Sequence, residues 1–232
     1  EGSFLSDAFP IDRDTLGNET ESTQAELTNG NIIIVYNDYN KAGTTHFDGD
    51  GHYGKIFAQI VGRETSGSEA INYVSQEIEV ASGLSSLDRV NGVEVVALSD
   101  GGFALAWQKL EYESTTGYEI ANAETLTQVY NNDGIPTSEV ILVNSSNVLV
   151  FPSLTADQYG GFSLSWSSND GLEQGADINS YAQHFDAQGN KIGLKFILND
   201  DHNGNQTAAD IEYLEDGRLL VTWMSDHNLE SG

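Results

Sequence analysis

Apolar and polar residues alternate along most of the chain in short runs, and glycine-containing turns separate the runs. Alternation puts successive apolar side chains on one face of an extended strand, and Asn-Gly, Asp-Gly or Gly-Gly between two runs is typical of a β-hairpin. Helical periodicity is almost absent, and only residues 117–127 are compatible with a helical turn. The pattern therefore predicts an all-β chain of short antiparallel strands.

Four segments share one motif, in which a glycine is followed six residues later by an aromatic residue. The glycines are Gly30, Gly101, Gly160 and Gly217, and the aromatic residues, spaced by 71, 59 and 57 residues, are Tyr36, Trp107, Trp166 and Trp223. Large apolar residues stand two and four positions before the aromatic residue, on the same strand face. The other face is small in the second and third segments, where it carries alanine or serine. We therefore expect strands packed between neighbouring sheets, with the aromatic residues in the core.

One strand-like run precedes each motif and two follow it, so each repeat contains four antiparallel strands in about 60 residues, the size of a generous propeller blade. We predict a single β-propeller-like domain over residues 1–232, with repeat units at 20–82, 88–145, 148–200 and 205–232 and an N-terminal strand at 4–12. The first and last units are incomplete, and the N-terminal strand matches a fourth strand. Three arrangements stay open: a four-bladed ring with a thin last blade, part of a larger ring, and an array of sandwiched sheets.

The composition narrows the functional classes. The formal net charge of −27 repels phosphate backbones and anionic lipid, so we expect neither nucleic-acid binding nor membrane insertion. The chain has no cysteine, which excludes disulfides, zinc–thiolate sites and cysteine nucleophiles. No apolar run approaches the roughly 18 residues of a membrane span. The absence of cysteine is compatible with export without disulfides.

Acidic loops follow the aromatic residue in three of the units and are candidate Ca²⁺ sites, because Ca²⁺ takes six to eight oxygen ligands. The candidate ligands are Asp38, Asp48, Asp50, Asp170, Asp177 and Asp226. The alternative is that these aspartates are ordinary turn formers on a solvated acidic surface. The acidic turn 199–205 is first interpreted as a connection between units.

Three stretches resemble a known repeat family. Residues 101–107 (GGFALAW), 181–190 (YAQHFDAQGN) and 196–199 (FILN) are similar to the GGFVVAW, YAQRFDADGN and FQVN repeats of large secreted bacterial RTX-like (hemolysin-type calcium-binding) exoproteins and adhesins. The resemblance is closest in the third unit and at the start of the fourth. The glycine-rich nonapeptide of true RTX rolls is absent. The resemblance implies a propeller-like fold and an extracellular or cell-surface location, and it implies no known activity.

Catalytic motifs are missing from the sequence: it holds neither a GxSxG elbow nor HExxH, and no catalytic or organic-cofactor residue is identified. We expect a non-catalytic binding or structural module, stabilised by calcium. The first alternative is a carbohydrate-binding propeller that uses exposed loop tyrosines such as Tyr159. The second is a glycoside hydrolase or lyase, which needs two or three convergent carboxylates. The expected partners are glycans or cell-surface polymers, with self-association or completion by additional repeats as a further expectation.

Overall fold

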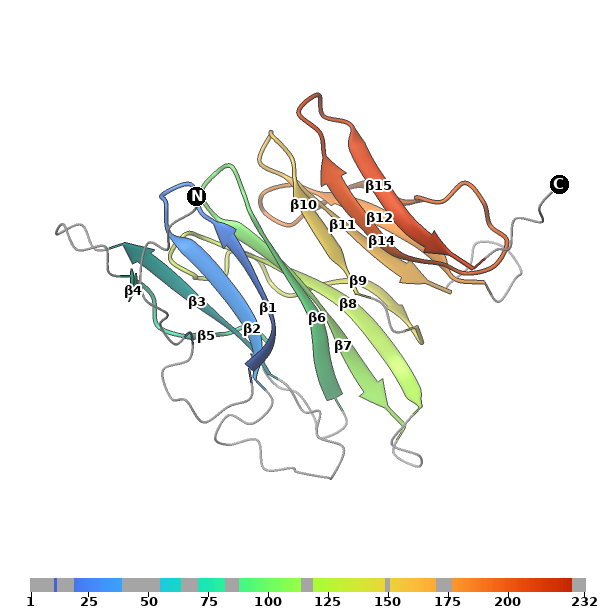
Figure 1. Ribbon diagram of the computed structural model, residues 1–232, viewed down its shortest axis with the longest axis horizontal. Helices are drawn as coiled ribbons and strands as arrows, with labels where there is room; N and C mark the ends of the chain where they lie inside the picture. Colours follow the sequence, from blue (N-terminus) through green and yellow to red (C-terminus); the bar gives the residue numbers. More distant parts are fainter. Residues whose placement is uncertain are drawn as a thin grey trace, which may run out of the picture.

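The regular elements of the fold, seen in a computed structural model, are all β-strands. The structure describes residue 11 and residues 19–38, 55–63, 71–81, 88–113, 119–148, 151–169 and 177–226. These residues form four antiparallel sheets that follow one another in chain order, from blue to red in Figure 1. Within them, no helix is long and apolar enough to cross a membrane. The predicted all-β class and antiparallel repeats are confirmed.

The first two sheets fall within the first two predicted units. The strands of the first sheet are β1 (Glu19–Glu26), β2 (Ile32–Asp38), β3 (Lys55–Arg63), β4 (Ile71–Tyr73) and β5 (Ile78–Glu79), with both β4 and β5 paired to β3. The strands of the second sheet are β6 (Asp88–Ala97), β7 (Phe103–Tyr112), β8 (Ile120–Tyr130) and β9 (Ile141–Ser146). The helical turn considered for 117–127 is wrong, because β8 pairs with β7 along almost its whole length.

The third and fourth sheets differ in strand number. The third contains β10 (Ser153–Ala156), β11 (Phe162–Ser168), β12 (Asn179–Phe185) and β13 (Lys191–Ile197). The fourth contains β14 (Gln206–Tyr213) and β15 (Leu219–Ser225). Four strands are thus seen in the second and third repeats, and two are described in the last. The predicted N-terminal strand at 4–12 lies outside the described residues, apart from residue 11.

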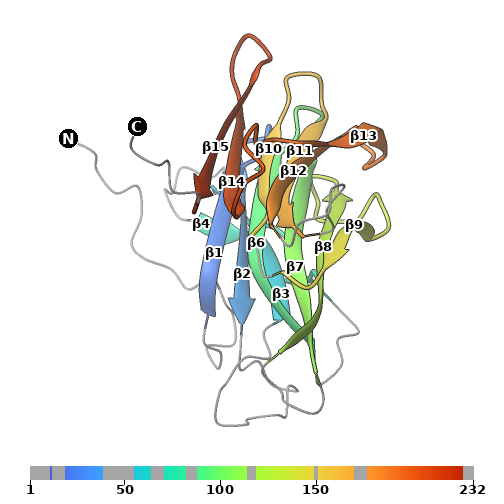
Figure 2. The same cartoon turned by 90° about the vertical axis from the view of Figure 1, so that its right-hand side faces the viewer.

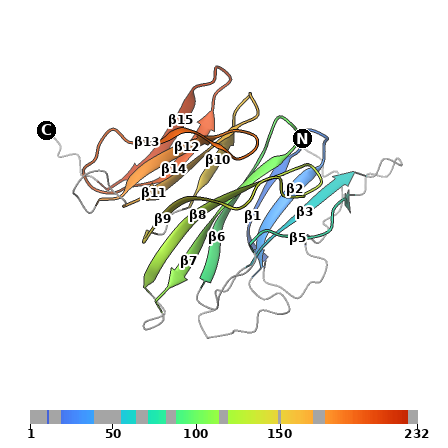
Figure 3. The same cartoon turned by 180° about the vertical axis from the view of Figure 1, so that it is seen from behind.

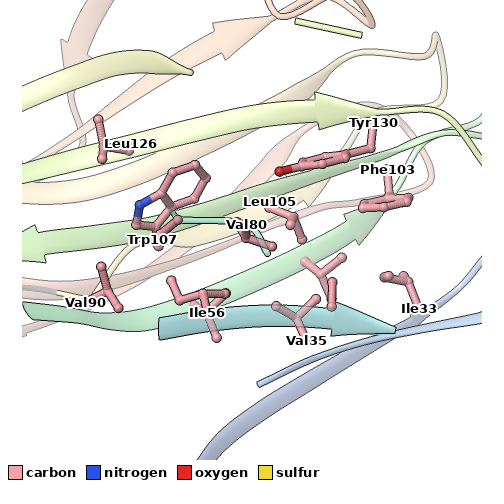
Figure 4. Close-up of a cluster of buried hydrophobic side chains, with 14 of the residues drawn as sticks. Ile33, Val35, Ile56, Val80, Val90, Phe103, Leu105, Trp107, Leu126 and Tyr130 are labelled. Carbon is pink, nitrogen blue, oxygen red and sulfur yellow. The ribbon is translucent and has the colours of Figure 1, made fainter. Parts of the chain in front are cut away.

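The second sheet is sandwiched between its neighbours as the alternation predicts. Phe103, Leu105 and Trp107 project from β7 into a core shared with the first sheet, as Figure 4 shows. Ala104 and Ala106, on the opposite face of β7, lie in a second core that contains the large side chains of β11. The large face of the third sheet therefore packs on the small face of the second. The small side chains allow the two sheets to approach closely.

The recurring hairpin turn has one geometry in the second and third sheets. Gly101 and Gly160 have φ values of 102° and 101°, which side chains other than glycine rarely tolerate. The next glycine is needed for a different reason, because a Cβ atom on Gly161 would lie 2.4 Å from the carbonyl oxygen of Phe185. The paired glycines thus set the turn and then bring the second strand close to the third.

The first strands of the units lie next to one another. β1 contacts β6, β6 contacts β10, and β10 contacts β14. Figure 2 shows the last strands β9 and β13 together on one side of the molecule. Figure 3, seen from behind, places the β14–β15 hairpin at one end of the series and the first sheet at the other. The first strands of the four sheets thus form one series, and the last strands of the second and third sheets lie to one side of it.

The fourth sheet docks on the third largely through hydrogen bonds. The Ser165 hydroxyl donates to the carbonyl oxygen of Ala209 at 2.8 Å, and the Tyr213 amide donates to Thr155 Oγ1 at 3.1 Å. A two-stranded hairpin is marginally stable in water by itself. Contacts with the third sheet therefore stabilise β14 and β15.

Candidate functional site

The predicted calcium ligands are distributed over different parts of the fold. Asp48, Asp50 and Asp170 lie outside the described residues. Asp38 is fully buried at the end of β2, where it stands opposite Lys55 in the strand register. Asp177 and Asp226 come close to one connection between units. Among the described residues, no group of three His, Cys, Asp or Glu side chains is placed to hold a metal ion.

Asp177 and Asp226 converge on the segment that leads into β14. The amide of Gly204 donates to Asp177 Oδ2 at 3.2 Å, and the amide of Asn205 donates to Asp226 Oδ1 at 2.6 Å. The Asn205 side chain also donates to Asp226 Oδ2 at 2.7 Å and accepts from the amide of Ile178 at 3.1 Å. This junction, defined by Asp177, Asn205 and Asp226, ties the third sheet to both strands of the fourth. The interpretation of 199–205 as a connection between units fits its position between β13 and β14.

The series of first strands brings two carboxylates together that were not singled out from the sequence. Glu94 projects from β6 and Asp210 from β14, and Asp210 also accepts a 2.7 Å hydrogen bond from the Ser153 hydroxyl on β10. Burial raises the pKa of Glu94, and the nearby negative charge of Asp210 raises it further. A raised carboxyl pKa next to a second carboxylate is one pattern that acid–base sites use.

The raised pKa of Glu94 predicts how stability changes with pH. The folded protein holds this proton more tightly than the unfolded chain, so stability decreases as pH rises from the ordinary value of 4.5 through the raised folded pKa. Above the ordinary pKa, the burial of Glu94 next to Asp210 is therefore destabilising. We expect Glu94→Gln to raise the melting temperature at pH 7, and the gain to shrink as the pH falls toward 4.5.

The control for this prediction is Glu212→Gln, which removes the same charge from an exposed position on β14. Thermal unfolding of both variants from pH 4.5 to 8 separates the local effect from relief of the overall negative charge. An equal gain in the two variants would assign the effect to net charge and contradict the role given to burial of Glu94.

A groove opens between the hairpin turns of the third and fourth sheets. It has a volume of about 640 Å³ and is lined by Ala156, Asp157, Gln158, Tyr159, Tyr213, Leu214, Glu215 and Gly217. Two tyrosine rings, one amide and two carboxyl groups therefore surround one open space. This combination suits a ligand with an apolar face and several hydroxyl groups.

A change in turn chemistry places Tyr159 at this groove. In the second sheet Asp100 stands just before the turn glycine and accepts the amide of Gly102. Tyr159 occupies the equivalent position in the third sheet, and Asp157, two residues earlier, accepts from the amides of both Tyr159 and Gly161 at 2.7 and 2.9 Å. The position of Asp100 is thus taken by a tyrosine side chain, which is 85% exposed at the turn tip.

The second tyrosine ring of the groove, that of Tyr213, is held in place through its hydroxyl group. The Tyr213 hydroxyl lies 2.8 Å from Ser163 Oγ and 3.1 Å from Nδ1 of His184, and Ser163 Oγ lies 2.5 Å from the same nitrogen. Ser163 is fully buried, and the His184 ring lies 5.0 Å from that of Phe196. The three polar groups hold one another, so the Tyr213 ring is fixed where it lines the groove.

Sequence reasoning identified only part of this geometry. The sequence predicts an exposed Tyr159, and the structure confirms this exposure. The Tyr213 ring and the Glu94–Asp210 pair were missed, since each depends on contacts between different units. Tyr159 in place of the turn aspartate was the one local signal, because the other three motifs carry Asn29, Asp100 or Asp216 there.

Comparison with known proteins gives a fold relationship only. Neither a protein-family model nor a curated protein matches the chain. A solved structure of a protein of unknown function from Dyadobacter fermentans DSM 18053 is similar, with a TM-score of 0.57 and 10% identity over 94% of this chain and 64% of that one. The chain thus spans 64% of the length of that structure. The α-L-arabinofuranosidase Arb93A from Fusarium graminearum, solved with an iminosugar inhibitor, matches with a TM-score of 0.46 and 11% identity over 90% of this chain and 75% of that one.

Proposed function

We propose that the chain is a non-catalytic, extracellular binding module of a large secreted or surface bacterial protein. Its sheets would form a β-propeller-like arc in which the first strands line the inner side. The chain-order contacts of β1, β6, β10 and β14 support this arrangement, as does the packing of the large face of the third sheet on the small face of the second. The secreted location rests on the repeat resemblance and on the acidic, cysteine-free composition.

The groove between the third and fourth sheets carries the proposal of binding. Tyr159 and Tyr213 offer ring surfaces, and Gln158 and Glu215 offer polar groups on the same opening. Sugars combine an apolar C–H face with hydroxyl groups, and such a ligand matches both kinds of surface. The carboxyl groups of the lining and the net charge of −27 favour a neutral or amino sugar over a uronic acid.

Tyr159→Ala tests the assignment of the groove. We expect the wild-type chain to bind neutral or amino-sugar oligosaccharides on a glycan array, and the variant to lose at least tenfold in affinity. Because Tyr159 is so exposed, its loss leaves the melting temperature nearly unchanged. Phe151→Ala, which removes another exposed aromatic ring outside the groove lining, is the matched control and keeps wild-type affinity. An array without hits, or equal loss in both variants, would refute the assignment.

Calcium stabilisation is the second part of the proposal, and it concerns the junction of Asp177, Asn205 and Asp226. The two carboxylates converge on one connection, and the loops after the aromatic residues are acidic in three units. Ca²⁺ bound there would neutralise both carboxylates, since it takes oxygen ligands.

Chelation tests this second part. We expect EDTA to lower the melting temperature by several degrees relative to saturating Ca²⁺, because a ligand that binds only the folded state stabilises it. Asp226→Asn should abolish most of this calcium response, whereas Glu212→Gln should keep it. An unchanged midpoint on chelation of the wild-type chain would remove calcium from the proposal and leave the junction as a hydrogen-bonded one.

Glycoside hydrolysis is a second candidate function, and the Glu94–Asp210 pair is the observation that favours it. A carboxylic acid with a raised pKa could protonate a leaving oxygen while an ionised partner assists. Turnover of aryl glycosides by the wild-type chain and its loss in Glu94→Gln would establish this function. Absence of turnover with retained glycan binding leaves the binding module.

A further inference from the structure

The groove between the third and fourth sheets differs in chemistry from the same place at the two preceding boundaries between units. Three of the side chains that line it, those of Tyr159, Tyr213 and Glu215, have other counterparts there. The equivalent residues are Asp100, Ala156 and Gln158 between the second and third units, and Asn29, Ala97 and Ser99 between the first and second. Two aromatic rings and one carboxyl group are therefore added at this boundary.

Tyr213 offers the groove a ring surface rather than a hydroxyl group. Its hydroxyl is already engaged, by Ser163 Oγ at 2.8 Å and by Nδ1 of His184 at 3.1 Å. The residues equivalent to Ser163 and His184 in the second unit are Ala104 and Val129, which are paired in the same register and cannot hold a hydroxyl. The polar pair is therefore present where Tyr213 is present. The face of a ring held in this way attracts a cation, because the π-electrons make it negative.

Both carboxyl groups of the lining keep oxygen atoms for a ligand. The two hydrogen bonds that Asp157 accepts come from amides of its own turn, and both end on Oδ1. Glu215 is exposed, and it makes neither a hydrogen bond nor an ion pair within the described residues. The lining contains no basic side chain, and Arg218, which follows it in the chain, is held by Asp216 at 2.7 Å. The groove therefore joins two rings to two carboxyl groups that no cation of the lining neutralises.

We propose that this groove selects an amino sugar with a free, positively charged amino group over the N-acetylated and neutral forms of the same sugar. The rings of Tyr159 and Tyr213 would contact the apolar sugar face and the ammonium group, and Asp157 and Glu215 would compensate the positive charge. Acetylation of the amino group keeps the sugar ring and removes the charge. The inference rests on the proposed function, because it names the ligand class of the same groove.

Calorimetric titration of the intact chain with two matched oligosaccharides tests the selection. The first is a tetramer of glucosamine and the second a tetramer of N-acetylglucosamine, both at pH 5.5, where the free sugar amines are protonated. We expect the glucosamine tetramer to bind about tenfold more tightly. Tetralysine, which has a similar positive charge but no sugar ring, measures the general attraction of cations to a chain with a net charge of −27. It should bind more weakly than the glucosamine tetramer.

Two substitutions locate the selection in the groove. Glu215→Gln removes one carboxylate, and Tyr159→Leu keeps an apolar side chain but removes the π face. Both residues are exposed, so neither substitution should disturb folding. We expect each to lower the affinity ratio of the two tetramers about threefold or more. Glu212→Gln, which removes the same charge from an exposed position on β14 outside the lining, should keep the wild-type ratio.

The possible failures can be told apart. Equal affinity for the two tetramers would overturn the selection and leave glycan binding in place, whereas binding of neither tetramer would remove the proposed function as well. Tetralysine binding as tightly as the glucosamine tetramer would replace selection by general attraction of cations. An equal effect of Glu215→Gln and Glu212→Gln on the affinity ratio would show that the groove does not read the charge, and would also overturn the proposal.

Discussion

Replacing Trp107 by alanine is expected to lower the free energy of unfolding by about 3–5 kcal/mol, the usual cost of truncating a large buried aromatic side chain. Trp107 is 2% exposed and lies in the core between the first and second sheets, next to side chains such as Ile56 and Val90 (Figure 4). A loss of this size is a large part of the 5–15 kcal/mol that stabilises a typical domain. Urea unfolding followed by far-UV circular dichroism measures it without relying on tryptophan fluorescence.

Trp223→Ala provides the comparison at the same position of the repeat. Trp223 is 36% exposed, so its truncation should cost on the order of 1 kcal/mol. Equal losses in the two variants would mean that Trp107 does not hold two sheets together, and this would contradict the core shared by the first and second sheets.

The second large effect is expected for Gly161→Ala. The new Cβ atom would lie 2.4 Å from the carbonyl oxygen of Phe185 and 2.8 Å from Asp157 Oδ2. The carbonyl group belongs to the backbone of β12, and the Phe185 ring is stacked on Phe162 with centroids 4.9 Å apart. Relief of the overlap therefore has to separate β11 from β12, and we expect a loss of about 2–3 kcal/mol.

The chain itself offers the control for this substitution. Arg218 occupies the position of Gly161 in the fourth repeat, where no third strand is described, so Arg218→Ala should change stability by less than about 0.5 kcal/mol. In the first repeat Asn31 occupies this position. The glycine that permits the close approach there is Gly62, on the neighbouring strand β3. If Gly161→Ala were as well tolerated as Arg218→Ala in urea unfolding, close approach would not be the reason for the second glycine.

The repeat pattern was predictable because it depends on local chemistry. The turn glycine, the period of two and the aromatic residue at the end of the strand are all visible along the chain, and they placed β2, β7, β11 and β15 correctly. The bounds of the first and fourth strands of the repeats were less predictable. In the third repeat the first strand begins only at Ser153, and in the first repeat two short strands, β4 and β5, stand where one fourth strand is expected. The Ser75 hydroxyl, which accepts the amide of Ile60, lies between these two short strands.

The site was less predictable for a physical reason. Tyr213 is oriented by Ser163 and His184, which lie 50 and 29 residues before it in the chain. Glu94 and Asp210 come from different sheets, and no spacing rule connects them. Contacts of this kind depend on how the sheets are stacked. The exposed Tyr159 could be identified from the sequence because its turn lacks the usual aspartate.

Chemical-shift mapping of the intact chain during titration with a neutral or amino-sugar oligosaccharide measures the location of binding directly. The proposed function predicts saturable shifts concentrated at residues 156–159 and 213–217, the two sides of the groove. It also predicts that a polyuronate of similar length leaves these signals in place. Shifts centred on the junction of Asp177 and Asp226, or no shifts with any oligosaccharide, would contradict it.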